Sequence, residues 1–366
     1  MLWRLMPVLA AALIIGGGAY IVVRTHHFGL VRALAQRHKL LSWLLALIPV
    51  GLVGLFGLAF NITAMAVVFL HLLLAWLFCD GVWLLVRPHL KRPVQHYWAG
   101  AAALAITALY LGAGWFFAHH VYETDRIFTT DKDLGGESIR IAALSDAHLG
   151  ITLDGEGFAA LLERVQATEP DAVVIVGDFV DDDTDRADML RACEALGELD
   201  TTYGVYFAYG NHDDGYFDYR NFSSAELRQA LAENGVTVLE DEAALLGDSF
   251  TIVGRKDRSR FDREGAADLT AALDPSRYIV MLDHQPNDYA AEAAAGADLV
   301  ISGHTHGGHI FPAGQIGLAL GINDSIYGVQ RRDDTDFLVT SGVSGWAIPF
   351  KTGCISEFVV IDITEE

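Results

Sequence analysis

Four long apolar stretches in the first third of the chain constrain its fold more than any other feature of the sequence. Each is long enough to cross the hydrocarbon core of a bilayer, which takes about 20 residues of helix. Tryptophan and tyrosine residues lie near several of their ends, as is common at membrane interfaces. We therefore predict an α-helical transmembrane bundle within residues 1–120, with spans at about 5–23, 40–60, 64–86 and 97–118.

The charge of the chain changes sign near residue 120. Residues 1–120 contain eight Lys or Arg and a single acid, Asp80, for a net charge of +7. Residues 121–366 contain 17 basic and 46 acidic residues, for a net charge of −29. A domain this negative repels nucleic acid, whose binding depends on neutralising phosphates. We expect two domains, 1–120 and 121–366, and no nucleic-acid scaffold as a partner.

Basic residues gather in two of the connections between the predicted spans. Residues 24–39 carry four Lys or Arg, and residues 87–96 carry three. Loops of this kind stay in the cytoplasm according to the positive-inside rule. We therefore expect a multi-pass protein of the cell membrane whose acidic domain lies outside the cytoplasm.

Two ionisable residues, His71 and Asp80, fall within the third predicted span. Such residues often mark an ion or proton path. Asp80, however, lies near the predicted cytoplasmic end, within reach of basic loop residues, and residues 1–120 offer no second carboxylate for a relay. We therefore favour anchoring over transport as the role of the bundle.

The second domain alternates short β-branched runs with stretches of helical period, which predicts an α/β fold. Helix-like stretches lie around 158–167, 185–196, 225–233 and 289–295. An additional edge strand is expected over 123–130. The other strand-like runs are 139–144, 172–176, 205–209, 250–253, 278–282, 299–301, 337–340 and 358–363.

Polar residues follow five of these predicted strands directly. Ligands of open α/β sheets bind at the carboxyl ends of strands. All six histidines of residues 121–366 lie in these blocks, which indicates one shared site. The blocks contain Asp146-Ala147-His148, Gly177-Asp178, Gly210-Asn211-His212-Asp213, Asp283-His284 and Gly303-His304-Thr305-His306-Gly307-Gly308-His309.

In this order the motifs resemble the calcineurin-like metallophosphoesterase superfamily, and they are most similar to its bacterial membrane-anchored phosphodiesterases. The likeness covers most of residues 139–363. It implies a β-sandwich flanked by helices, with metal ligands at the carboxyl ends of strands. The chain departs from the pattern at Lys351, where Arg is expected, at Ser356, where Pro is usual, and at His309, a place often held by Gln.

The resemblance also implies a site for two divalent metal ions. One ion would be held by Asp146, His148, His306 and a bridging Asp178. The other would be held by Asp178 with Asn211, His284 and His304. Mixed imidazole and oxygen ligands suit Mn, Fe or Zn. Such a pair lowers the pKa of a bridging water, which attacks as hydroxide, and binds the attacking and leaving oxygens.

The same resemblance suggests roles for residues around the metals. His212 would protonate the leaving oxygen or stabilise its charge. Asp213 would orient His212 through a hydrogen bond, with a capping role as the alternative. Asp181 is a candidate to support a ligand. His309 either contacts the substrate phosphate or closes its loop. The acids around Asp185 are interpreted as a helix start.

These features predict a membrane-anchored phosphoesterase that hydrolyses phosphodiester or pyrophosphate bonds, with lipid-linked or envelope substrates as candidates. One alternative is a cytoplasm-facing pyrophosphatase of a nucleotide-linked lipid precursor. Another is a non-catalytic metal-binding sensor. The preference between monoesters and diesters, the metals in the cell and the oligomeric state remain open at this point.

Overall fold

The structure is a computed structural model that describes residues 6–90, 96–217 and 219–366. The chain divides into two compact units, Met1–Ala113 and Gly114–Glu366. The start of the first predicted span and part of the basic connection 87–96 lie outside the described residues.

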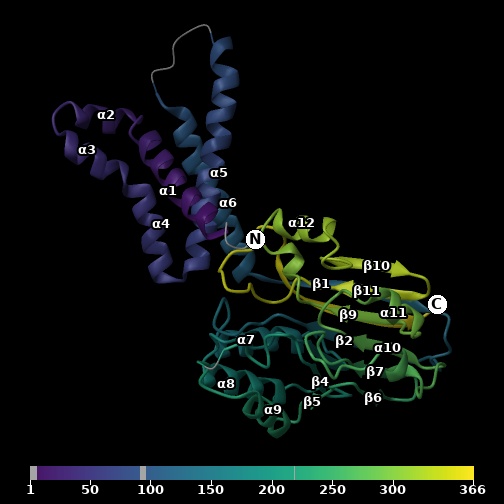
Figure 1. The fold of residues 1–366 in the computed structure, drawn as a ribbon. Helices are drawn as coiled ribbons and strands as arrows, with labels where there is room; N and C mark the ends of the chain where they lie inside the picture. Colours follow the sequence, from purple (N-terminus) through teal and green to yellow (C-terminus); the bar gives the residue numbers. More distant parts are fainter. Residues whose placement is uncertain (1–5, 91–95, 218) are drawn as a thin grey trace. The chain divides into compact units, whose positions relative to one another are not determined.

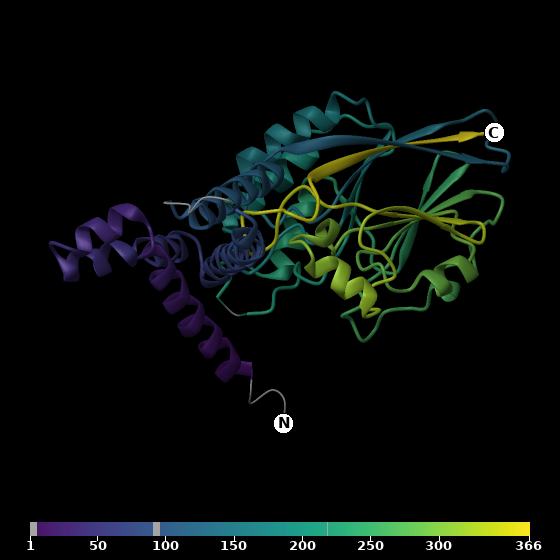
Figure 2. The same cartoon turned by 90° about the horizontal axis from the view of Figure 1, so that it is seen from above.

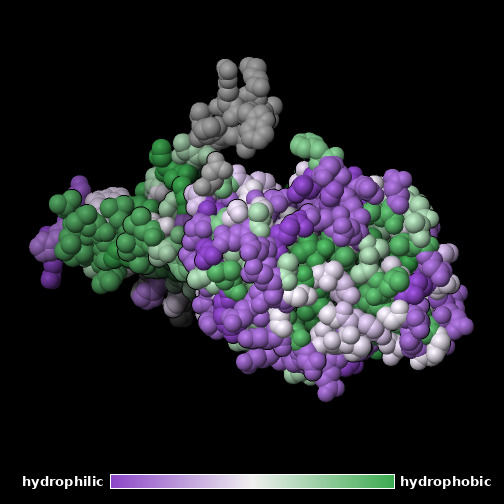
Figure 3. Space-filling model, turned by 90° about the horizontal axis from the view of Figure 1, so that it is seen from below, coloured by the Kyte–Doolittle hydropathy of each residue, from purple (hydrophilic) through white to green (hydrophobic). Residues whose placement is uncertain are grey.

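The regular secondary structure of the N-terminal unit is entirely helical over its described residues (Figure 1). Large hydrophobic side chains remain exposed on these helices, and Figure 3 shows them covering the surface of this unit. Its helices are α1 (Met6–Thr25), α2 (Gly29–Ala35), α3 (Lys39–Ala46), α4 (Ile48–Ala59), α5 (Ile62–Val86), a 3₁₀ turn (Arg87–His89) and the start of α6 (Trp98–His119).

Two of these helices are long and apolar enough to cross a membrane, namely Ile62–His89 and Trp98–His119. They coincide with the third and fourth predicted spans. The second predicted span is broken into α3 and α4, which bend by 44° and count as one span only if taken together. Pro49 at the start of α4 lacks the N–H that a continuous helix would use. In the region of the first predicted span, the apolar helix over described residues is the shorter Ala10–Thr25.

Asp80 is neutralised within the N-terminal unit. Its carboxylate pairs with the guanidinium of Arg24 and accepts a hydrogen bond from Tyr20. Tyr97 donates a further hydrogen bond of 2.7 Å to it, and Trp76 donates to the Tyr97 hydroxyl at 2.8 Å. A buried carboxylate that is paired and hydrogen-bonded in this way needs no transported ion to explain it. The contacts therefore agree with a structural role for Asp80.

The C-terminal unit contains two mixed six-stranded sheets. The first has the order β1-β12-β2-β3-β4-β5. β2, β3, β4 and β5 run parallel, β12 is antiparallel to β2, and β1 is parallel to β12. Its strands are β1 (Val121–Thr130), β2 (Ile139–Leu144), β3 (Ala172–Val176), β4 (Val205–Ala208), β5 (Thr237–Val238) and β12 (Ser356–Glu365).

The second sheet has the order β10-β11-β9-β8-β7-β6. Its four inner strands are parallel, and an antiparallel strand closes each edge. The two edge strands escape sequence prediction because they are polar or half-exposed and lack a clear apolar run. The strands are β6 (Glu242–Leu246), β7 (Phe250–Gly254), β8 (Tyr278–Leu282), β9 (Leu299–Ser302), β10 (Gly328–Arg332) and β11 (Thr335–Val339).

Alternation along the strands separates three layers of core. Ile141 and Val174 of the first sheet belong to one buried cluster with Ile252 and Val280 of the second, so the two sheets share an apolar core. The opposite face of the first sheet packs on helices α7 (Gly155–Gln166), α8 (Arg186–Gly197) and α9 (Ser224–Glu233). The opposite face of the second sheet packs on α10 (Ala266–Thr270) and α11 (Tyr289–Ala294). Figure 2 shows both sheets lying between these two sets of helices.

Candidate metal centre

The side chains of the candidate centre follow the carboxyl ends of strands in both sheets. Asp146 and His148 follow β2, and Asp178 follows β3. Asn211 and His212 follow β4, His284 follows β8, and His304 and His306 follow β9. Because parallel strands end at a common edge, local sequence already brings these residue types to one place. The structure brings the carboxyl ends of strands from both sheets together at the candidate centre.

The backbone at these positions is strained. Asp146, Asp178 and His304 have φ values of 54°, 52° and 67°. His148 and His306 have φ values of 36° and 48°. Such values are uncommon for residues other than glycine and cost of order 1–3 kcal/mol each. They persist here because buried surroundings hold each turn, and strain of this kind concentrates at functional sites.

Two groups of acidic and imidazole side chains have the spacing of metal ligands. In the first group Asp146, His148 and His306 bring ligand atoms within 4.8 Å of one another. Asp178, His284 and His304 do the same in the second group. Asp178 lies between them, since its Oδ2 is 3.0 Å from His284 Nε2 and 3.6 Å from His148 Nε2. One carboxylate can therefore serve both groups.

Hydrogen bonds fix which nitrogen each imidazole presents. His284 Nδ1 lies 2.8 Å from the carbonyl of Val176, and His306 Nδ1 lies 3.2 Å from the carbonyl of Ser344. A ring that donates from Nδ1 leaves the Nε2 lone pair for a metal. The Nε2 atoms of His148 and His284 are buried and, among the described residues, face Asp178 Oδ2 without forming a hydrogen bond. Imidazole nitrogens that make no hydrogen bond and face carboxylate oxygens are suitable ligands for a divalent cation.

Protonation of the histidines is set by burial and by the neighbouring carboxylates. Burial lowers the pKa of His304 to about 4 and lowers that of His306 well below its usual value. Burial also lowers the pKa of His284, but Asp178 and Asp146 outweigh this effect and hold that pKa well above normal. Neutral imidazoles are the form that binds a metal. The pKa values of His304 and His306 therefore favour the neutral form that binds a metal. The raised pKa of His284 favours its protonated form, so a bound cation would have to displace that proton.

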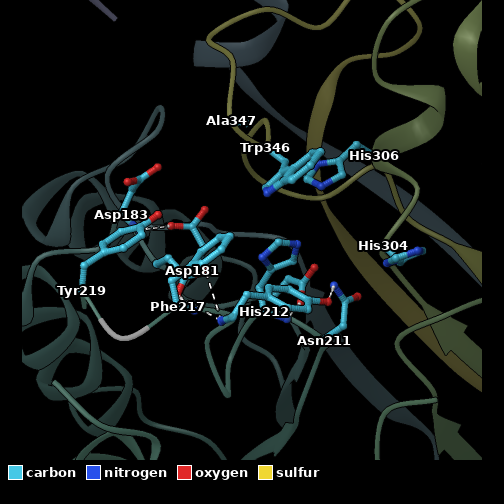
Figure 4. A pocket seen from close by; sticks show the side chains of 13 residues that line it. Asp181, Asp183, Asn211, His212, Phe217, Tyr219, His304, His306, Trp346 and Ala347 are labelled. Atoms are coloured by element: carbon cyan, nitrogen blue, oxygen red, sulfur yellow. Dashed lines mark hydrogen bonds between the residues drawn. The ribbon is translucent and has the colours of Figure 1, made fainter. Parts of the chain in front are cut away.

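A cavity of about 710 Å³ opens beside these groups. Figure 4 shows Asn211, His212, His304 and His306 facing into it. Asn211 Nδ2 donates to the Tyr216 hydroxyl at 2.9 Å. His212 Nδ1 is buried without a hydrogen-bond partner among the described residues. Burial lowers the pKa of His212, opposed by the charge of Asp178. The ring is therefore positioned to act on a group bound in the cavity.

The expected hydrogen bond between Asp213 and His212 is wrong for the described structure. Asp213 is buried, and its two oxygens accept bonds from four backbone N–H groups. The distances from the donors are 2.9 Å for Asp178, 2.8 Å for Phe179, 3.1 Å for Val180 and 2.7 Å for Gly210. The carboxylate is thus occupied by the loops that carry Asp178 and Asn211. This matches the capping alternative.

Asp181 and His309 are also placed by the structure. Asp181 Oδ2 lies 3.3 Å from His148 Nδ1, close enough to hold the His148 ring in its orientation. The carbonyl of His309 accepts hydrogen bonds from the N–H groups of Thr352 and Gly353, which ties its loop to the closing segment. Asp185 caps α8 by accepting from the N–H of Ala187 at 2.8 Å, which is the predicted helix start.

Two residues near the centre escaped sequence reasoning. Gln285 Nε2 donates to both oxygens of the buried Asp257, at 2.9 and 3.0 Å, and lies 3.5 Å from Asn211 Oδ1. Asp257 follows β7, an inner strand of the second sheet whose end carries no histidine. Its position after a predicted strand was the available signal.

The contacts of Lys351 in the closing segment account for a lysine at the position where arginine was expected. The Lys351 ammonium is fully buried and donates to the carbonyls of Ser341, Gly342 and Ile355. Burial lowers the pKa of Lys351 to about 8. Three converging carbonyls suit three N–H donors of an ammonium group. The residue therefore holds the loop behind Asp146.

Comparisons with known proteins find similar phosphoesterases. A family model for calcineurin-like phosphoesterases matches residues 139–308. An uncharacterized metallophosphoesterase of Aquifex aeolicus is 32% identical, covering 64% of this chain and 88% of the relative. One of Campylobacter jejuni is 31% identical, covering 67% and 65%. A transmembrane protein with a metallophosphoesterase domain from Danio rerio is 32% identical, covering 61% and 52%. The matches thus span about half to two thirds of the latter two relatives.

Proposed function

Because this chain belongs to the calcineurin-like metallophosphoesterases, we propose that it is a membrane-associated, metal-dependent phosphoesterase with a two-metal centre. The observation that carries the proposal is Asp178, whose Oδ2 lies 3.0 Å from His284 and 3.6 Å from His148. A single carboxylate within reach of two ligand groups supports a site for two metal ions.

In this proposal Asp146, His148, His306 and Asp178 hold one ion. Asp178, Asn211, His284 and His304 hold the second. Mn, Fe or Zn suit these donors. When bound, the ion pair supplies a water activated for attack and binds the attacking and leaving oxygens of the displacement.

The protein's own residues then set up the reaction. Asp181 holds His148 in orientation, while Asp213 fixes the turns that carry Asp178 and Asn211. Asn211 contributes an oxygen without adding negative charge, which leaves the site able to attract an anionic phosphate. His212 faces the cavity and offers an N–H to the leaving oxygen, as a proton donor or as a hydrogen-bond donor that stabilises its charge.

In the membrane part of the proposal, four spans precede a catalytic domain that begins near residue 121. This domain lies outside the cytoplasm. It acts on diesters or pyrophosphates, with lipid-linked compounds as candidate substrates. Support comes from two apolar helices of spanning length and from a relative named as a transmembrane protein. Protease treatment of intact cells carrying a tag at Glu366 tests the orientation. Loss of the tag agrees with it, and protection of the tag indicates the cytoplasm-facing alternative.

Hydrolysis by the full chain in detergent micelles tests the activity. The protein is stripped with a chelator, reloaded with Mn²⁺ and offered bis-(p-nitrophenyl) phosphate or the monoester. We expect metal-dependent turnover of the diester. A folded protein that binds two metals per chain and hydrolyses neither ester contradicts the catalytic proposal and favours the sensor alternative.

Variants separate the metal-binding residues from the proton donor. Asp178→Asn is expected to bind less metal and to fall to the activity of the stripped protein. His212→Ala is expected to keep its metal and to lose about 10²–10⁴-fold in turnover. Asp248→Asn is the control. Asp248 is exposed in the turn before β7, at the end of this strand opposite to the candidate metal centre.

A further inference from the structure

The cavity beside the candidate metal centre has an aromatic wall that the proposed chemistry does not use. Tyr216, Phe217 and Tyr219 follow β4, and Trp346 follows β11. These four side chains are between 45% and 64% exposed, although each has a large apolar ring. Exposed apolar groups gathered around a cavity are typical of a binding site. The wall therefore belongs to the part of a substrate that extends away from the phosphate.

Carboxylates line the cavity next to the aromatic wall. Asp181, Asp182 and Asp183 line it, and none of its thirteen lining residues is Lys or Arg. Asp182 accepts hydrogen bonds from the backbone N–H groups of Tyr216 and Phe217, at 3.0 and 2.9 Å, which ties the acidic loop to the aromatic one. Asp183 is exposed and takes part in none of the ion pairs found among the described residues.

Phe217 and Tyr219 lie with Asp181 and Asp183 toward one end of the cavity. Figure 4 shows Asp183 and Tyr219 at one end of the cavity and His304 at the other. The stacked rings of Phe217 and Tyr219 have centroids 5.5 Å apart. The two ends of the cavity therefore differ in charge: one is negative and aromatic, and the other would be positive with its metals.

We infer that the cavity binds a phosphodiester whose alcohol carries an alkylammonium group, with the phosphate at the candidate metal centre and the cation against Tyr219, Phe217 and Asp183. This inference rests on the proposed function. Aromatic faces attract quaternary and alkylated ammonium ions, and a nearby carboxylate adds to the attraction. A polyphosphate or nucleotide would bring negative charge to Asp183. A plain acyl chain would account for the rings but leave the carboxylates unexplained.

Two substrates of the same shape test the charge preference. p-Nitrophenyl phosphorylcholine is compared with p-nitrophenyl 3,3-dimethylbutyl phosphate, in which carbon replaces the ammonium nitrogen. In each reaction water adds its oxygen to phosphorus, the bond to the p-nitrophenyl oxygen breaks, p-nitrophenolate leaves, and the released proton goes to solvent. We expect kcat/KM to be about tenfold higher for the choline ester, the size of a cation–π contact with a carboxylate. Equal values for the two esters overturn the inference.

Variants locate the preference within the cavity. Asp183→Asn and Phe217→Leu should each bring the ratio of the two kcat/KM values closer to one. Asp248→Asn removes the same charge at the end of β7 opposite to the candidate metal centre and should leave the ratio unchanged. A ratio that is unaltered in Asp183→Asn and in Phe217→Leu overturns the assignment of the cation to this end.

The alkylammonium group has two sources, a lipid headgroup or a small water-soluble diester. Phosphatidylcholine in mixed micelles and glycerophosphocholine in solution are therefore compared, with release of choline or phosphocholine as the readout. Turnover of either one supports the inference and identifies its source. Turnover of neither, while bis-(p-nitrophenyl) phosphate is hydrolysed, contradicts it.

A binding measurement separates this inference from the proposed activity. Isothermal titration calorimetry compares phosphocholine with 3,3-dimethylbutyl phosphate on the full chain in detergent. Tighter binding of phosphocholine, reduced in Asp183→Asn, supports the inference even if no ester is hydrolysed and the catalytic proposal fails. Equal affinities overturn the inference while leaving any hydrolysis of bis-(p-nitrophenyl) phosphate as support for the enzyme.

Discussion

Asp213 holds Asp178 by its backbone: the N–H of Asp178 donates to Asp213 Oδ2 at 2.9 Å, and the same carboxylate accepts from Gly210 at 2.7 Å. Gly210 lies so close that a Cβ added to it would be 2.2 Å from Asp178 Oδ1. Asp213 thus joins the loops after β3 and β4 and sets the position of the carboxylate proposed to bridge two metals. Its role is to position a ligand, although it neighbours His212 in sequence.

Replacing Asp213 with Ala should therefore destabilise the protein and weaken metal binding. Four buried N–H groups would lose their acceptor, and each buried unsatisfied group costs about 1–3 kcal/mol. We expect a drop of several degrees or more in the Tm of the detergent-solubilised protein and a loss of bound Mn²⁺. A variant that keeps its Tm and metal but loses only turnover would instead support the hydrogen bond to His212. Asp248→Asn is the matched control.

Replacing Asn211 with Asp should weaken capture of the substrate phosphate. The change adds a negative charge next to Asp178 while conserving the shape of the side chain. At a few ångströms one added charge is worth about 1 kcal/mol or more, so KM for the diester should rise on the order of tenfold. Steady-state kinetics measure this, with Gln229→Glu on helix α9 adding the same charge elsewhere. An unchanged KM would contradict the proposed charge surplus.

Cys193 should make stability decrease at alkaline pH. Burial in the core raises the pKa of this thiol from its ordinary value of 9.0 to about 12. Above pH 9 the unfolded thiol ionises while the folded thiol stays protonated, so stability falls as pH rises from 9 towards 12. At pH 10 the loss is about 1.4 kcal/mol.

The effect of Cys193 is measured by denaturant unfolding of the wild type and of Cys193→Ala at pH 7.5 and 10. The variant loses apolar contacts at both values, and its disadvantage should shrink at pH 10. A disadvantage that stays constant between the two pH values would show that Cys193 does not contribute to the alkaline loss.

Breaking the Arg24–Asp80 pair should destabilise the helical unit. Removing one partner leaves the other charge uncompensated among apolar side chains, which costs up to about 3 kcal/mol for a pair that is partly exposed. We expect Arg24→Met and Asp80→Leu each to lower the Tm in detergent. The double variant should regain most of the loss. Additive losses in the double variant would show that the two charges do not depend on each other.

Much of the candidate site could be predicted because its determinants are local. The runs that became β2, β3 and β8 are short and mostly apolar, so their boundaries follow from the sequence. Asp146, Asp178 and His284 are each the second residue after their strand. The apolar helices Ile62–His89 and Trp98–His119 follow equally from composition, because membrane insertion depends on summed hydropathy.

Other features depend on residues that meet only in the fold. Asp213 accepts from three N–H groups that lie 33 to 35 positions away, so its neighbour His212 gave a misleading signal. The aromatic wall combines Tyr216, Phe217 and Tyr219 with Trp346, more than 120 residues apart along the chain. Sequence alone determined which residue types end each strand, since strand periodicity is local. Tertiary structure decided which backbone groups and rings meet them, because those contacts depend on how the two sheets pack.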